Sequence, residues 1–296
     1  MTENRSDKFY FDRGDVVLQI EDTTFNLHRD ILGRYSGFFS SMFSMPTNDD
    51  QEGTLEKPLV LSSDLCSASI FTVLCEFLYP ERMGQFPAVS IAQIGHWETV
   101  LTATAALQMD DTQQYILQKL RDDASNIGPS AAKILRLALD YEEGPTSDLL
   151  LSALYILAYR RQPITSREII TLGERAANLV SYTRESVRCC FFLNRARSRI
   201  QVSTPCNEKD TCRASVFRQV IANMQCRATN RVDDYEPNIF HIASEQGMCA
   251  SCGPQRTTIA TSLRSSLLDE VVKKCYADTL LVWSEDPRSD NESMSE

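Results

Sequence analysis

The stretch that decides the fold is DVVLQIEDTTFNLHRDILGRYSGFFSSMF, which occupies residues 15–43. At its start Val16, Leu18 and Ile20 alternate with other residues, as they would in a strand with one buried face. A polar turn at 21–23 follows, and the alternation then resumes. We therefore expect residues 15–28 to form a β-hairpin.

Two short helices are expected directly after the hairpin. The first carries apolar residues at 31, 32 and 35, and Ser36 suits the N-cap of the second. The second helix repeats apolar side chains at helical spacing: Phe39, Met42 and Phe43.

Residues 59–120 continue this mixed pattern. We expect a short strand at 59–61 and an amphipathic helix at 70–78. The segment 81–95 is typical of a loop, and further helices are expected around Trp97 and up to residue 120. Asp110 or Asp111 is the expected cap of the last helix.

This series of elements resembles the BTB/POZ domain. That family has an Asp before an apolar strand, a Phe and a His-Arg or His-Lys pair on the second strand, and then the pattern L-x-x-x-S-x-x-F-x-x-M-F. The residues that carry the resemblance are Asp15, Val16, Val17, Phe25, His28, Leu32, Ser36, Phe39, Met42 and Phe43. The segments LVL (59–61) and FTVLCEFLY (71–79) continue it, and it extends over residues 12–125.

The resemblance implies an α+β fold, in which a small β-sheet is flanked by a helix cluster, and a role in binding other proteins. Some members form homodimers, and some deliver substrates to a cullin-type ubiquitin ligase. In dimeric members a buried charged pair corresponds to Asp15 and Arg29; the alternative is that Asp15 caps the strand and Arg29 is solvated. Only 14 residues, mostly polar, precede Asp15, which argues against the swapped dimer that uses a preceding helix.

Four further regions complete the expected organisation. Residues 1–11 are expected to be flexible, and 126–202 to form an all-helical extension. Within it, KILRLA (133–138), RRQPIT (160–165) and LGE (172–174) are similar to an extension found in many fungal BTB proteins, and Thr165 with Glu168 fits a capping box. Residues 203–283 form a cysteine-containing region with a final helix, and 284–296 an acidic, disordered tail.

The cysteines of the C-terminal region suggest a metal site. Cys249 and Cys252 form a C-x-x-C-G turn typical of a zinc knuckle, and Cys206 and Cys212 are the best candidates for the other two ligands, with Cys226 and His241 as substitutes. A structural zinc ion is one interpretation. Unliganded cysteines that only pack, and a redox pair, are the alternatives, the last being least favoured because no thioredoxin-like pattern surrounds the pair.

The composition and the absence of certain motifs argue against several classes of function. The formal net charge is −10, which argues against nucleic acid as a partner. The arginines between 184 and 199 are the local exception: we expect them to form a solvated helix face, and contact with nucleic acid is the less favoured alternative. No stretch reaches the roughly 20 apolar residues that span a membrane, and the N-terminus lacks a secretory signal. No phosphate-binding or nucleophile motif is present. We therefore expect a non-catalytic binding or scaffold protein of the cytoplasm, the nucleus or both, with a cullin adaptor or a transcription-related regulator as alternatives.

Overall fold

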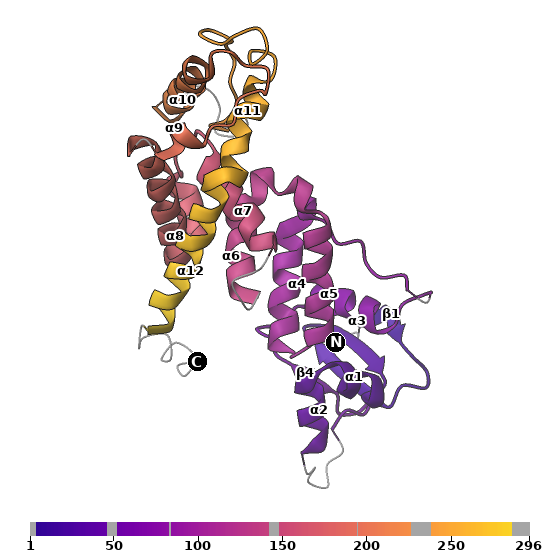
Figure 1. Cartoon of the computed structure of the whole chain (residues 1–296). Helices are drawn as coiled ribbons and strands as arrows, with labels where there is room; N and C mark the ends of the chain where they lie inside the picture. The colour runs from indigo at the N-terminus through magenta and orange to yellow at the C-terminus, as the bar shows by residue number, and fades with distance from the viewer. Residues whose placement is uncertain are drawn as a thin grey trace. The chain divides into compact units, whose positions relative to one another are not determined.

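A computed structural model describes residues 4–45, 52–82, 84–141, 148–193, 195–225 and 238–285. The chain divides into two compact units, Met1–Asp123 and Ala124–Glu296, so the boundary lies two residues before the expected one (Figure 1). Among the described helices, none combines the length and the apolarity that crossing a membrane requires.

Unit 1 contains a four-stranded sheet in the order β1-β3-β2-β4. Its strands are β1 (Asn4–Tyr10), β2 (Val16–Ile20), β3 (Thr23–Leu27) and β4 (Leu59–Leu61). The predicted hairpin is confirmed, because β2 and β3 pair antiparallel with Val16 opposite Leu27 and Ile20 opposite Thr23. Strands β1 and β4 flank it, each parallel to its neighbour.

Strand β1 corrects the expectation that residues 1–11 are flexible. Residues 4–10 pair with β3, and the Phe11 amide donates a 2.9 Å hydrogen bond to the Asn26 carbonyl. Phe9 is buried, whereas most other side chains of the strand are exposed. An edge strand needs only one buried side chain and its backbone hydrogen bonds, so its composition is that of a polar segment.

In the described part of unit 1, five α-helices and a 3₁₀ turn accompany this sheet. They are α1 (Arg29–Tyr35), α2 (Gly37–Ser44), α3 (Ala68–Leu78), η1 (Ile91–Gln93), α4 (Ile94–Ala106) and α5 (Asp110–Asp122). The predicted N-cap is confirmed, since the Ser36 hydroxyl accepts from the Phe39 amide. The Asp caps were wrong: Met109 occupies the cap of α5 and both aspartates lie in its first turn, where the helix dipole favours negative charge.

Unit 2 is helical. It contains η2 (Ala124–Asn126), η3 (Gly128–Ser130), α6 (Ala131–Tyr141), α7 (Asp148–Tyr159), α8 (Ser166–Phe192), α9 (Arg195–Arg199), α10 (Lys209–Gln225), α11 (Arg256–Leu263) and α12 (Asp269–Glu285), with a π-helical turn, η4 (Arg264–Leu268), before α12. The capping box of Thr165 and Glu168 is confirmed at the start of α8. Gly173, at φ 71°, kinks that helix.

Three expectations for unit 2 need correction. Arg184 is buried rather than solvated, and its guanidinium donates to the carbonyls of Leu157, in the last turn of α7, and Gln162, just after that helix. The cysteine-containing region, for which only a final helix was expected, also includes α10 and α11. Residues 284 and 285 belong to α12, and the rest of the expected tail, 286–296, lies outside the described residues.

Candidate functional site

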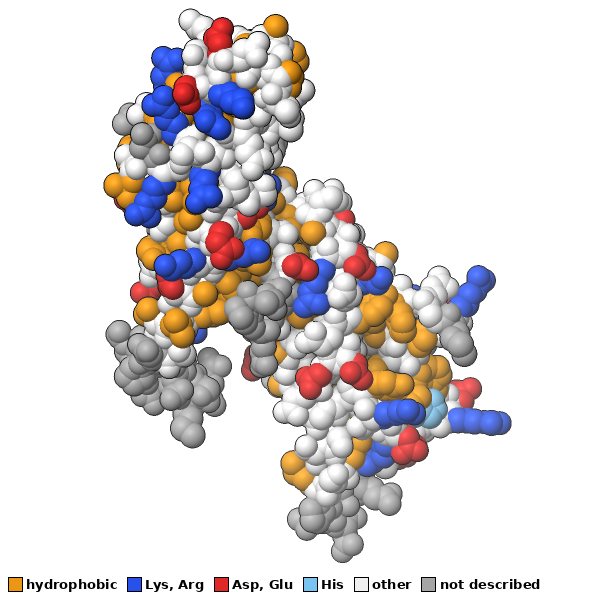
Figure 2. Space-filling model, in the orientation of Figure 1, with side chains coloured by type: hydrophobic (Ala, Val, Ile, Leu, Met, Phe, Trp, Pro, Cys, Tyr) orange, Lys and Arg blue, Asp and Glu red, His pale blue; other side chains and the backbone are white. Residues whose placement is uncertain are grey.

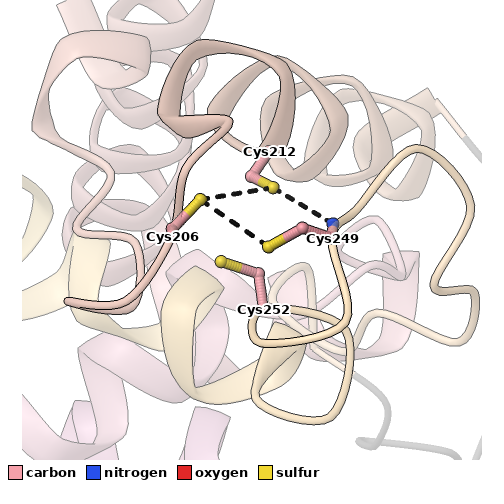
Figure 3. Close-up of side chains that lie close together, drawn as sticks. All are labelled: Cys206, Cys212, Cys249 and Cys252. Atoms are coloured by element: carbon pink, nitrogen blue, oxygen red, sulfur yellow. Dashed lines mark hydrogen bonds between the residues drawn. The ribbon is translucent and has the colours of Figure 1, made fainter.

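Four cysteines from two distant parts of the chain meet in unit 2. Cys206 lies in the loop before α10, Cys212 in the first turns of that helix, and Cys249 and Cys252 in the turn before α11 (Figure 3). All four sulfur atoms lie within 4.8 Å of one another. The structure thus brings together the four residues that the sequence proposed as one ligand set.

The spacing of the sulfur atoms suits a tetrahedral metal ion. The Sγ of Cys206 lies 3.7 Å from the Sγ of Cys212 and 3.7 Å from that of Cys249. A tetrahedral site with Zn–S bonds of about 2.3 Å has edges of about 3.8 Å. Four thiol sulfurs and no other donor are also the ligand set of a closed structural zinc site, so the residues present fit this ion.

The backbone turn at Cys249 holds the cluster together. The Cys249 amide donates to the Sγ of Cys212 at 3.3 Å, and the amides of Cys252 and Gly253 both donate to the Cys249 carbonyl at 3.0 Å. A Cβ at position 253 would lie 2.8 Å from a carboxylate oxygen of Glu245, so a larger residue here would displace the end of that side chain.

The surroundings of the four sulfur atoms lower the pKa of one thiol and raise the pKa of others. Hydrogen bonds from backbone amides, that of Cys252 first, lower the pKa of Cys249 to about 7. Burial raises the pKa of Cys212 and raises that of Cys252 to about 12. A bound cation would stabilise all four as thiolates, because metal ligation requires the deprotonated form.

The two substitute ligands do not join the cluster. His241 is exposed and its ring is absent from the group of sulfur atoms, as far as the described residues show. Cys226 lies outside the described residues. Cys66 and Cys75 are buried in unit 1, where burial raises the pKa of Cys66 to about 11, as expected for cysteines that pack in a core.

The signature residues of the N-terminal unit are mainly structural. Leu32 and Phe39 are fully buried, while Met42 and Phe43 are half-buried. The His28 ring packs against Phe11 and Tyr79, at centroid distances of 5.4 Å and 5.9 Å. The His28 amide also donates to the Tyr79 hydroxyl at 3.1 Å, so this histidine fixes the end of β3 against α3.

Asp15 and Arg29 meet, but not as a buried ion pair within the chain. Asp15 is exposed, and its carboxylate accepts a 2.7 Å hydrogen bond from the Arg29 backbone amide. Arg29 is half-buried, and its guanidinium donates to the backbone carbonyls of Asp15 and Glu52. Asp15 therefore satisfies an amide at the start of α1, which is a capping role.

A groove in unit 1 was missed by sequence reasoning. It has a volume of about 590 Å³ and is lined by Lys8, Phe9, Phe11, Glu76, Tyr79, Pro80, Glu81, Gln85, Phe86 and Pro87. Figure 2 shows apolar side chains gathered on this unit near β1 and α3. The only sequence signals were the aromatic residues before the hairpin and the Pro80 to Pro87 segment, which we interpreted as a loop.

Comparison with known protein families agrees with the fold and the bounds of unit 1. No curated protein matches the chain. The expected likeness of the helical extension to fungal proteins therefore stays a prediction. Residues 4–123 match the family model of the BTB/POZ domain, and that match ends at the same residue as unit 1. This match, together with the small sheet and its helix cluster, supports a BTB-domain protein.

Proposed function

We propose that the chain is a non-catalytic binding protein that acts in the cytoplasm, the nucleus or both, through partners held by unit 1. BTB/POZ domains generally mediate protein–protein interaction, and residues 4–123 match that family. The observation that carries the proposal is the groove beside β1, which combines an aromatic lining with charged residues at its edge.

The occupant that fits this groove is an extended, proline-containing segment of a partner protein. Rings of Phe11 and Tyr79 lie 4.9 Å apart, and Phe86 extends the apolar lining, as in grooves that accept polyproline helices. Lys8 pairs with Glu76 at 3.1 Å, while Glu81 lines the groove beside them. A basic residue on the partner would complement this acidic edge.

The test is affinity purification with quantitative mass spectrometry of the wild-type chain and two variants. Phe86→Lys places a charge in the groove, whereas Val60→Lys changes an exposed side chain on β4 and serves as the control. We expect a set of proline-containing partners to be lost with Phe86→Lys and kept with Val60→Lys. Identical partner lists for all three proteins would contradict the proposal.

The same purification separates more specific roles. A substrate adaptor of a cullin-type ubiquitin ligase would retain a cullin under mild lysis, and a transcription-related regulator would retain nuclear proteins instead. A homodimer would be seen as a doubled mass in light scattering.

We also propose a structural zinc ion at the four cysteines. Its support is the 3.7 Å separation of the sulfur atoms and the all-thiol donor set. The ion would join the loop before α10 to the turn before α11. Purified protein should contain close to one equivalent of zinc per chain, with Cys249→Ser losing it and the exposed Cys189→Ser keeping it. Negligible zinc, together with unchanged stability of Cys249→Ser, would contradict the site.

A further inference from the structure

A concentrated positive surface covers the end of α8 and the helices α9 and α10. Residues 186–225 hold seven Lys or Arg and two Asp or Glu, a local net charge of +5 in a chain whose total is −10. Figure 2 shows Lys and Arg side chains gathered over α9 and α10, in the upper part of the view. The acidic residues that dominate the composition therefore lie elsewhere in the sequence.

The three arginines of α9 are left unused by the fold. Ala196 and Ile200 face the core, which turns Arg195, Arg197 and Arg199 outward. Within the described residues, none of these three guanidinium groups takes part in a hydrogen bond or an ion pair. Several other arginines of unit 2, by contrast, form hydrogen bonds or ion pairs within the fold.

Arg213 and Arg256 are examples of arginines whose guanidinium groups interact within unit 2. The Arg213 guanidinium donates to the Ile200 carbonyl at 3.1 Å, and Arg256 pairs with Glu245 at 2.9 Å. The α9 arginines are thus available to an anion from outside the chain.

An exposed aromatic ring lies close to these cations in the sequence. Phe192, the last residue of α8, is 74% exposed. It lies four residues after Arg188, so both project from the same side of the helix. Arg195 follows at the start of α9. An aromatic face next to several free cations can stack on a base while the cations neutralise phosphates.

We propose that the surface formed by Arg188, Phe192, Arg195, Arg197 and Arg199 binds single-stranded nucleic acid. The guanidinium groups contact phosphates and Phe192 stacks on a base. An acidic peptide would satisfy the charges but leave the ring without a role, so the exposed phenylalanine favours a nucleic acid. This proposal departs from the expectation drawn from the net charge, because that charge averages over the whole chain, whereas binding depends on the local surface.

The test uses the full-length chain and a fluorescent oligothymidine of about 16 nucleotides, followed by anisotropy at about 50 to 200 mM salt. The variant R195E/R197E/R199E should bind at least about tenfold more weakly, with a salt slope smaller by about two, since each contact to a single strand contributes about 0.7. The matched control R13E/R82E/R167E changes the net charge equally at exposed arginines elsewhere and should stay within about twofold of the wild type.

A second pair of variants tests the ring. Phe192→Ala should weaken binding by about five- to a hundredfold, whereas Leu193→Ala, an exposed side chain without a π face, should not. Polyglutamate should compete far less well than unlabelled oligothymidine. No binding at low salt, equal binding by the α9 variant and its control, or an unchanged affinity of Phe192→Ala would each overturn the proposal. An unchanged Phe192→Ala combined with full competition by polyglutamate would indicate an acidic protein as the partner instead.

Discussion

The guanidinium of Arg160 forms a bidentate ion pair with the carboxylate of Glu168, and both side chains are largely buried, at 4% and 14% exposure. The same carboxylate accepts from the amide and hydroxyl of Thr165, which completes the capping box of α8. The pair therefore joins the end of α7 to the start of α8, and breaking it would leave a buried charge without compensation.

Glu168→Gln is expected to lower the free energy of unfolding of unit 2 by about 3 kcal/mol, in the range found for buried pairs that lose one partner. Asp140→Asn is the matched control, because its pair with Arg136 is longer, at 3.9 Å, and more exposed, at 54% and 32%, and should contribute less than about 1 kcal/mol. Urea unfolding of both variants measures the difference. Equal losses of unfolding free energy in the two variants would show that the Arg160–Glu168 pair stabilises the fold no more than the Arg136–Asp140 pair does.

The stability of unit 2 at acid pH should depend on the same ion pair between Arg160 and Glu168. Burial raises the pKa of Glu168, but hydrogen bonds from Arg160 and Thr165 outweigh it and bring the pKa to about 2. Because the folded pKa lies below the unfolded value of about 4.3, the stabilisation is complete above that value and is lost as the pH falls toward 2. The stability difference between wild type and Glu168→Gln should therefore begin to shrink below a pH of about 4.3 and close only as the pH approaches about 2, and a constant difference down to that pH would contradict this assignment.

Arg184 should tolerate neither shortening nor loss of its planar group. Its guanidinium donates to the carbonyls of Leu157, Arg160 and Gln162, which the end of α7 would otherwise leave unsatisfied. We expect Arg184→Met to cost about 3 kcal/mol and Arg184→Lys nearly as much, since an ammonium cannot reach three carbonyls in one plane. Arg188→Met, one turn later and partly exposed, should change thermal stability by less than about 0.5 kcal/mol.

Features carried by short spacings could be predicted from the sequence. The hairpin, the Ser36 cap and the capping box each depend on residues within a few positions of one another, where local geometry decides the outcome. The two cysteine pairs were also visible locally, as C-x-x-C and C-x5-C. Their proximity was inferred only from the need of a metal for four ligands.

Features that depend on distant contacts could not be predicted. Arg184 is buried because carbonyls 22 to 27 residues earlier surround it, and nothing in its own segment indicates this. The groove joins Phe9 and Phe11 to Phe86, far apart in the sequence. Strand β1 is polar at nearly every position, so its pairing with β3 leaves almost no pattern to detect.

Two N-cap serines in unit 1 allow a matched comparison. Ser36 accepts from the Phe39 amide and also donates to the Leu107 carbonyl at 2.6 Å, whereas Ser67 caps α3 without such a tertiary bond. Ser67→Ala should cost about 1 kcal/mol, as is usual for a cap. Ser36→Ala should cost about 2 to 3 kcal/mol, because it also leaves a buried carbonyl unsatisfied. Chemical denaturation measures the loss of stability in each variant, and equal losses for Ser36→Ala and Ser67→Ala would contradict this prediction.

Metal removal should act on unit 2 and leave unit 1 folded. The four cysteines connect the loop before α10 with the turn before α11. Chelation of zinc-loaded protein should therefore lower the melting temperature of unit 2 and increase hydrogen exchange at the amides of 206–212 and 249–253. Exchange in β2 and β3 should stay unchanged, since these strands belong to a separate compact unit. If chelation alters neither region, or if Cys189→Ser removes the response as fully as Cys249→Ser does, the four sulfur atoms are packing residues and the zinc proposal fails.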